Sequence, residues 1–132
     1  MVTGGKGPEK RFKKGLTSVE LLLINGTRLC ALPDLPVDRW EHSQTGPITC
    51  GGGNSNSQAI SCVKFSGGTW QQTHTLGQPR HGHTAWVSPR GGVWLMGGFF
   101  VKKGEFDTRT TTELLNDDGS TTASFNLDNQ RR

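Results

Sequence analysis

Pairs of glycines that end short apolar runs recur at a nearly constant interval along the sequence. The pairs begin at residues 4, 51 and 97, so the two intervals are 47 and 46 residues. A Glu-Leu-Leu segment at Glu20 recurs at Glu113, two periods away, and residues 59–63 supply its middle copy. An Arg-x-x-His motif also recurs, at Arg39 and at Arg80. Three elements in one order at one period predict a repeat architecture, which limits the folds open to this chain.

Each repeat has the pattern of short strands joined by tight turns. Asn-Gly and Gly-Gly dipeptides between β-rich segments are typical of hairpins. Because no stretch keeps a sustained 3.6-residue apolar period, the sequence predicts an all-β fold with four strands per repeat. The expected strand-turn-strand segments are residues 19–24 followed by Asn25-Gly26, residues 60–73 around Gly67-Gly68, residues 83–96 and residues 114–127.

Composition excludes several other classes of protein. The 19 glycines follow no three-residue period, so the chain is not collagen-like. No run of 18 apolar residues occurs, so the sequence predicts no membrane-spanning helix. The net charge is +4, and residues 6–14 hold five of the 15 Lys and Arg residues. This balance is compatible with an acidic partner.

The order of features within one repeat resembles the kelch family of β-propellers. The best copy has a glycine pair, a β-rich segment, a tryptophan after a hairpin, an arginine and the next glycine pair. These features are Gly51-Gly52, residues 60–63, Trp70, Arg80 and Gly97-Gly98. The resemblance implies a β-propeller built from four-stranded antiparallel blades. It divides the chain into a partial first blade with the start of the next (1–43), a central repeat (44–87) and an incomplete last repeat (88–132). The first copy departs from the pattern because it has no Trp after its hairpin turn, and the last offers Phe125 instead.

The length of the chain is short for a closed propeller. Its 132 residues hold about 2.8 repeats, whereas closed propellers have four to eight blades. We therefore expect a fragment of a longer propeller. The alternative is a small open stack that self-associates through exposed apolar blade faces.

The resemblance implies a protein-interaction module of kelch type without catalysis of its own. Kelch proteins include adaptors of ubiquitin ligases and actin-binding proteins, and they bind partners through inter-strand and inter-blade loops. We expect those loops to offer positive and aromatic groups to a protein or peptide partner, with an acidic segment as the expected class. For the two arginines of the Arg-x-x-His motif, the alternative is a hydrogen bond to backbone carbonyls between blades. The candidate binding residues are Arg11, Lys13, Lys14, Arg39, Arg80, Phe99, Phe100, Lys102 and Lys103.

Two further functions remain as alternatives. One is an inert portion of a copper enzyme of the galactose-oxidase type, which also uses a kelch propeller. The chain has no tyrosine, so a copper site with tyrosine ligands cannot be complete within it. The other is nucleic-acid binding through the basic segment, which has few interleaved aromatic residues. No catalytic motif is present, and we expect no metal or other cofactor at His74, His81 and His83.

Three sequence features bear on the cellular compartment. Cys50 and Cys62 lie on successive predicted strands and are predicted either to form a disulfide or to remain as buried thiols. Cys30 has no obvious partner. Asn25-Gly26-Thr27 is a sequon for N-glycosylation as well as a turn signal. Together these features favour an extracellular setting for the parent protein, with a cytoplasmic one as the alternative.

Overall fold

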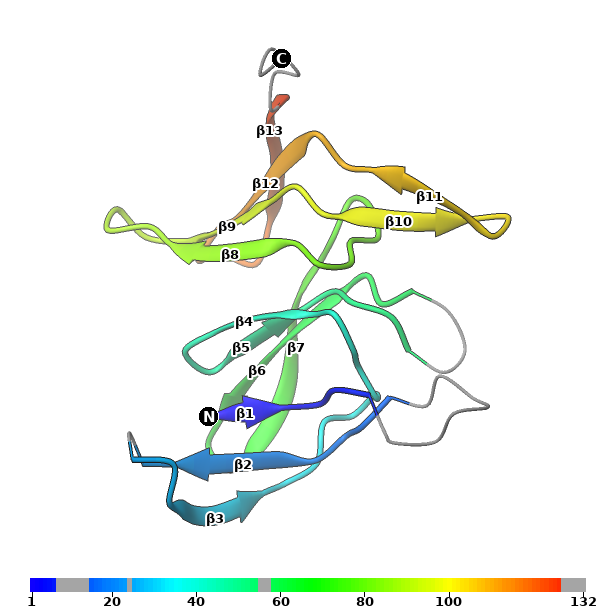
Figure 1. Ribbon diagram of the computed structural model, residues 1–132. Helices are drawn as coiled ribbons and strands as arrows, with labels where there is room; N and C mark the ends of the chain where they lie inside the picture. Colours follow the sequence, from blue (N-terminus) through cyan, green and yellow to red (C-terminus); the bar gives the residue numbers. More distant parts are fainter. Residues whose placement is uncertain (7–14, 24, 55–57, 127–132) are drawn as a thin grey trace.

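The computed structural model describes residues 1–6, 15–23, 25–54 and 58–126 (Figure 1). Within these ranges the regular elements are β-strands, so the predicted all-β class is confirmed. The strands form three larger antiparallel sheets and one separate hairpin. None of the described residues belongs to a helix of the length and hydrophobicity that crossing a membrane requires.

The first sheet has the strand order β1-β2-β3 and is antiparallel throughout. Its strands are β1 (Val2–Thr3), β2 (Val19–Leu22) and β3 (Arg28–Leu32). The turn between β2 and β3 lies at the predicted Asn-Gly dipeptide. Gly26 has a φ of 82°, and the Asn25 side-chain oxygen accepts a hydrogen bond from the Thr27 N–H at 3.0 Å.

The second sheet contains four strands that follow one another along the chain, in the order β4-β5-β6-β7. Its strands are β4 (Ser43–Thr45), β5 (Ile48–Cys50), β6 (Ser61–Ser66) and β7 (Thr69–Thr75). Gly67 and Gly68 join the last two strands with φ values of 59° and 82°. Two successive residues with positive φ match the right-handed twist of a hairpin, which explains why the turn is Gly-Gly.

The third sheet has the order β13-β12-β9-β8. Its strands are β8 (Thr84–Val87), β9 (Val93–Met96), β12 (Thr111–Leu115) and β13 (Thr121–Asn126). The hairpins predicted for residues 83–96 and 114–127 are therefore present in outline.

Between β9 and β12 the structure corrects the sequence interpretation. Phe99, Phe100, Lys102 and Lys103 were expected to lie in a binding loop, but this segment forms the antiparallel hairpin of β10 (Phe99–Lys102) and β11 (Glu105–Thr108). Lys103 and Gly104 form its turn with φ values of 52° and 84°. The strands form because the Phe-Phe-Val run has high β propensity, and because Lys-Gly supplies a tight turn. The hairpin projects beyond the edge of the third sheet (Figure 1).

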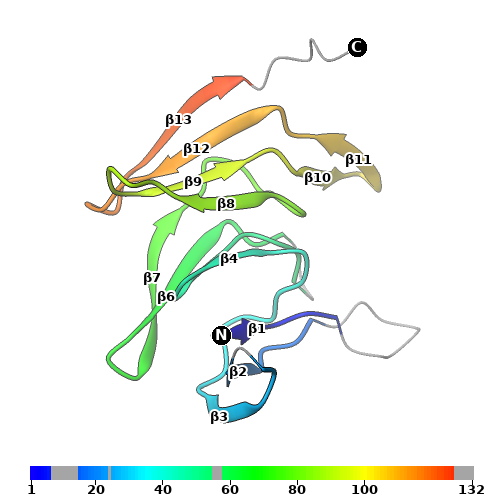
Figure 2. The same cartoon turned by 60° about the vertical axis from the view of Figure 1, so that its left-hand side comes forward.

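The three larger sheets are stacked one above the other, as Figures 1 and 2 both show. The core between the first and second sheets is built on Val19, Leu35 and Val63, with Trp70 packed against them. The Trp70 indole N–H also donates to the Pro33 carbonyl at 2.8 Å. Trp70 thus joins its own sheet to the preceding one.

The core between the second and third sheets contains the remaining large cluster of buried apolar residues. Its members are Cys50, Cys62, Leu76, Val93, Leu95 and Leu115. Cys50 and Cys62 are directly opposite each other on β5 and β6, and the structure joins them in a disulfide. Cys30 on β3 is an exposed free thiol.

The glycine pairs lie where one sheet passes close to the connection that follows the preceding sheet. Gly52 has a φ of 86°, and a Cβ atom there would lie 2.5 Å from the Trp40 carbonyl oxygen. Gly98 has a φ of 91°, and its Cβ would lie 2.5 Å from the His81 carbonyl oxygen. Both positions therefore require glycine for backbone conformation and for space.

Candidate functional site

Arg39 was a candidate binding residue, but its side chain is fully buried between the first and second sheets. Its guanidinium donates to the carbonyls of Gly51 and Ser61 at 2.9 and 2.8 Å, and to the Ser61 hydroxyl at 2.7 Å. Burial lowers the pKa of Arg39 to about 10, and the neighbouring Asp38 charge partly opposes this shift. Arg39 is therefore not available to a partner.

Arg80 makes the same contacts one repeat later and is also fully buried. Its guanidinium donates to the carbonyls of Gly97 and Thr111 at 2.9 and 2.8 Å, and to the Thr111 hydroxyl at 2.7 Å. It also forms a 2.8 Å ion pair with Glu113, whose side chain is 3% exposed. The surface role expected for both arginines is thus corrected, and the alternative, hydrogen bonds to backbone carbonyls of the next sheet, is confirmed.

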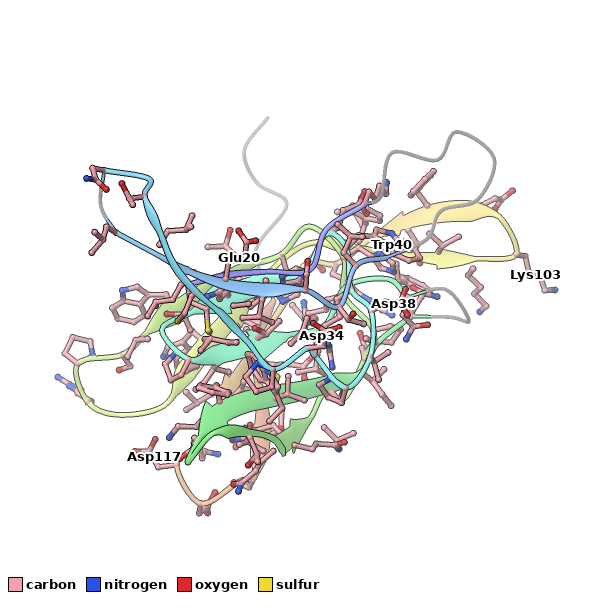
Figure 3. All side chains as sticks on the ribbon, turned by 90° about the horizontal axis from the view of Figure 1, so that it is seen from below. Glu20, Asp34, Asp38, Trp40, Lys103 and Asp117 are labelled. Carbon is pink, nitrogen blue, oxygen red and sulfur yellow. A yellow bond between two sulfur atoms is a disulfide. The ribbon has the colours of Figure 1, made fainter. Side chains whose placement is uncertain are left out.

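The other candidate residues fall into three groups. Arg11, Lys13 and Lys14 lie outside the described residues. Phe100 is covered by the Arg109 guanidinium, which stands 3.6 Å from the centre of its ring. Lys102, Lys103 and Phe99 belong to the β10–β11 hairpin, and Figure 3 shows Lys103 at its far tip.

The hairpin carries less positive charge than the Lys-Lys pair suggests. Lys102 lies directly opposite Glu105 across the two strands, and Asp107 follows on β11. All four residues of β11 are exposed, including Phe106, which is 72% exposed. The hairpin therefore presents an aromatic side chain among charges of both signs.

The base of this hairpin forms one wall of a groove of about 400 Å³. Four chain segments that are far apart in sequence meet the hairpin here: the connections after β1 and β5, and the turns that follow Arg39 and Arg80. We call this the Glu41 groove. Its lining residues are Lys6, Trp40, Glu41, Gln58, His81, Phe99, Val101 and Phe106.

His81 forms the floor of the Glu41 groove, where two backbone hydrogen bonds tie it to Phe99. The His81 N–H donates to the Phe99 carbonyl at 2.7 Å, and the Phe99 N–H donates to the His81 carbonyl at 2.9 Å. Their rings are stacked with centroids 5.3 Å apart, and Phe106 meets Phe99 edge-on at the same centroid distance. The backbone hydrogen bonds between His81 and Phe99 therefore fix the position of the aromatic side chains that line the groove.

Gln58 fixes the orientation of the His81 ring. Its amide oxygen accepts from the Val101 N–H at 3.0 Å, and its amide nitrogen donates to the Val101 carbonyl at 2.6 Å. The same oxygen lies 3.1 Å from His81 Nε2. Because an amide oxygen can only accept, Nε2 must carry a proton, which leaves Nδ1 to face Glu41.

Glu41 carries the clearest sign of backbone strain in the groove. Its φ is 54°, in the left-handed region that non-glycine residues seldom occupy. The Gly82 N–H donates to its carbonyl at 2.8 Å, which helps to hold this conformation. The carboxylate lies 3.1 Å from Lys6 Nζ and 3.6 Å from His81 Nδ1. This arrangement places one carboxylate between a cationic side chain and an imidazole at the entrance of an aromatic groove.

Of the residues that line the groove, the sequence analysis named Phe99 and His81 but not Glu41, Gln58 or Phe106. Trp40 and Glu41 follow directly after a repeated arginine, which is the one sequence signal that points to them.

The remaining predicted features lie away from the groove. Asn25 is exposed on the β2–β3 turn, where an acceptor sequon is sterically accessible. His83 is buried, and its Nε2 is 2.7 Å from the Ser43 hydroxyl. Burial, together with the charge of Arg80, lowers the pKa of His83 to about 4, so the ring is neutral at pH 7. Within the described ranges, no three His, Cys, Asp or Glu side chains are grouped as a metal ion would require.

Comparison with known proteins gives no family assignment. No protein-family model matches this sequence, and no curated protein matches it. The kelch resemblance therefore stays a prediction drawn from residues within the chain.

Proposed function

We propose that this chain is a portion of a kelch-type β-propeller and that it binds a protein partner without catalysing a reaction. Support comes from the repetition of one joint between sheets. At each of the two described joints, a buried arginine donates to the carbonyl of the glycine pair of the next sheet, at Gly51 and at Gly97. The same joint at the same repeat spacing is expected when successive blades pack in a ring.

The observation that carries the binding proposal is the Glu41 groove. It lies at the edge of the stack where connections between strands gather, and such connections on a rigid scaffold often carry binding residues. Its floor is fixed by paired backbone hydrogen bonds between His81 and Phe99. Phe106 is 72% exposed, so it can gain contacts when a partner covers it.

The chemistry of the groove defines the partner. Phe99 and Phe106 provide an aromatic surface for an apolar side chain of a peptide segment. Lys6, at the rim, bonds Glu41 in the free protein and is 45% exposed. A carboxylate beside the apolar side chain of the partner would form an ion pair with Lys6 in place of Glu41. The proposed ligand is thus an exposed peptide segment with an apolar residue next to an acidic one.

A random twelve-residue peptide display library, panned against the purified chain, tests this proposal. We expect selected peptides to combine an apolar and an acidic residue, and Phe106→Ala to weaken their binding by at least tenfold. Val87→Ala is the matched control, because Val87 is an apolar residue that is 52% exposed on β8, away from the groove. Peptides whose affinity is unchanged by Phe106→Ala would contradict the site, and failure to select any consensus would contradict the function.

A further inference from the structure

The two edges of the β10–β11 hairpin differ in how their backbone groups are used. On the β10 side, Phe99 exchanges two backbone hydrogen bonds with His81, at 2.7 and 2.9 Å. The Val101 N–H and carbonyl bond the side-chain amide of Gln58 at 3.0 and 2.6 Å. Both residues of β10 therefore direct their backbone polar groups away from β11, and neighbouring segments of the chain satisfy those groups.

The β11 edge carries the matching backbone groups without such partners. Thr108 lies directly opposite Phe99, and Phe106 lies directly opposite Val101. In an antiparallel ladder, directly opposite residues either bond each other or both direct their groups outward. Phe106 and Thr108 therefore direct their N–H and carbonyl groups away from β10. Among the described residues, β11 pairs with β10 alone, and all four residues of β11 are exposed.

Phe106 provides an apolar contact at the centre of this edge. By register it shares a face of the hairpin with Val101, and both line the Glu41 groove. Phe106 is 72% exposed and also lines a second hollow of about 420 Å³. An apolar side chain on a strand added beside β11 would cover this ring.

The opposite face of the hairpin is acidic along the same edge. Glu105 and Asp107 belong to β11, and alternation along the strand places both on this face. The cations of this face lie toward β10. Lys102 is directly opposite Glu105, and the Arg109 guanidinium covers Phe100, which is opposite Asp107. An incoming strand would therefore meet the two carboxylates first.

These carboxylates disfavour a second copy of β11 as the occupant of the edge. Antiparallel pairing centred on Phe106 would place Glu105 of one copy opposite Asp107 of the other. Parallel pairing in register would place each carboxylate beside its own equivalent. Like charges in these positions are destabilising, whereas opposite charges across two strands stabilise the pair. The edge therefore favours a strand that carries lysine or arginine.

We propose that β11 is a docking edge for an extended segment of a protein partner in which an apolar residue lies between two basic residues. The segment adds a third strand to the hairpin, and its backbone bonds Phe106 and Thr108. Its apolar side chain lies beside Phe106, and its basic side chains meet Glu105 and Asp107 on the opposite face. In this mode, main-chain hydrogen bonds supply affinity and alternate side chains supply specificity.

This inference goes beyond the Glu41 groove and does not depend on its ligand. The two surfaces share Phe106, but the groove ligand pairs with Lys6, whereas the added strand bonds the backbone of β11. Lys6→Ala should therefore weaken the peptides selected for the groove and leave binding of the added strand unchanged. Thr108→Pro should have the reverse effect, so the two proposals fail separately.

Fluorescence anisotropy with a labelled ten-residue peptide, whose centre reads Thr-Lys-Val-Lys-Thr, tests the proposal on the purified chain. The valine is the residue expected opposite Phe106, so its N–H points at β11. A methyl group on the valine amide nitrogen should raise the dissociation constant by about tenfold or more, because it removes a main-chain hydrogen bond and obstructs pairing. Glutamate in place of both lysines should weaken binding by a similar factor.

A pair of variants at one position tests the protein side. Thr108→Pro removes an outward N–H that makes no bond to β10, so the hairpin can keep its own ladder. It should weaken binding of the lysine peptide by about tenfold or more. Thr108→Val keeps the N–H and is the matched control, with an expected change within about threefold. Circular dichroism of both variants must match that of the unchanged protein.

Four results would overturn the proposal. They are no binding of the lysine peptide at submillimolar concentration, equal affinity for the N-methylated peptide, equal affinity of Thr108→Pro, and self-association of the free chain that Thr108→Pro abolishes. The last result would assign the edge to a second copy. The N-methylated peptide requires no change to the protein, so it tests the proposal even if Thr108→Pro does not fold.

Discussion

Loss of the buried Arg80 side chain should be the most damaging single change to the stack of sheets. Arg80→Ala removes a 2.8 Å ion pair to Glu113 and the hydrogen bonds to the carbonyls of Gly97 and Thr111. Glu113, only 2% exposed, would then be a buried charge without its cationic partner. Breaking such a pair costs about 3–5 kcal/mol, a large share of the 5–15 kcal/mol of a typical domain.

Comparison with Arg39→Ala isolates the contribution of the carboxylate. Arg39 makes similar carbonyl bonds, but Val63 occupies the position that Glu113 occupies beside Arg80. Its removal therefore leaves no buried carboxylate behind, and we expect a smaller loss than for Arg80→Ala. Equal losses for the two variants would refute the reasoning.

Urea denaturation, followed by the fluorescence of the four tryptophans, measures these free energies of unfolding. If Arg80→Ala does not fold, Glu113→Gln keeps the shape of the side chain and should cost about 1–3 kcal/mol. Glu105→Gln is the matched control on the exposed β11 strand and should change stability by less than about 0.5 kcal/mol. A Glu113→Gln value as small as that of the control would also count against the account.

Three further changes test other parts of the fold. The pKa of His83 is about 4 in the folded state and 6.5 in the unfolded state, so the unfolded state binds more protons between these values. The free energy of unfolding should therefore fall by about 3 kcal/mol between pH 6.5 and 4. Acid denaturation that His83→Gln does not reduce would contradict this. Reducing the Cys50–Cys62 disulfide, which spans 12 residues, should lower the free energy of unfolding by about 3 kcal/mol. Urea titrations with and without reductant measure this loss, and equal midpoints would argue against a stabilising disulfide. Gly52→Ala should lower the stability by at least about 2 kcal/mol more than Gly26→Ala, because both glycines have similar φ but only Gly52 is crowded. Thermal melts measure this difference, and equal losses would show that crowding plays no part.

The repeat elements could be predicted from sequence because backbone geometry demands particular residues there. Glycine is needed where a Cβ atom would lie 2.5 Å from a carbonyl oxygen, as at Gly52 and Gly98, and no other residue type satisfies both φ and space. The Gly67-Gly68 turn could be predicted for the same reason, because both residues have positive φ. Local conformational requirements of this kind are visible in a single sequence.

The binding groove could not be predicted because it depends on contacts between distant segments. Glu41 meets Lys6 and His81 across separations of 35 and 40 residues. The residues next to Glu41 do not predict its positive φ, which is stabilised by a hydrogen bond from the Gly82 N–H. These interactions exist only after the sheets have stacked.

The misplaced candidates show how charge alone misleads. Arg39 and Arg80 are cationic and lie in connections between strands, features that favour a surface role. Both guanidinium groups are nevertheless buried and donate hydrogen bonds to backbone carbonyls. A cation that recurs at every repeat is more simply explained by a joint that recurs at every repeat. The residues that do face solvent at the hairpin, such as Phe106, occur once.

Amide chemical shifts of the ¹⁵N-labelled chain, titrated with a peptide selected from the display library, test the central claim most directly. The account predicts that the largest changes fall on the residues of the Glu41 groove, with Glu41, His81 and Phe106 among them, while the β8–β9 turn is unaffected. Changes concentrated on β8 around the exposed Trp86, or spread evenly over the three sheets, would contradict the assignment of the groove as the binding site.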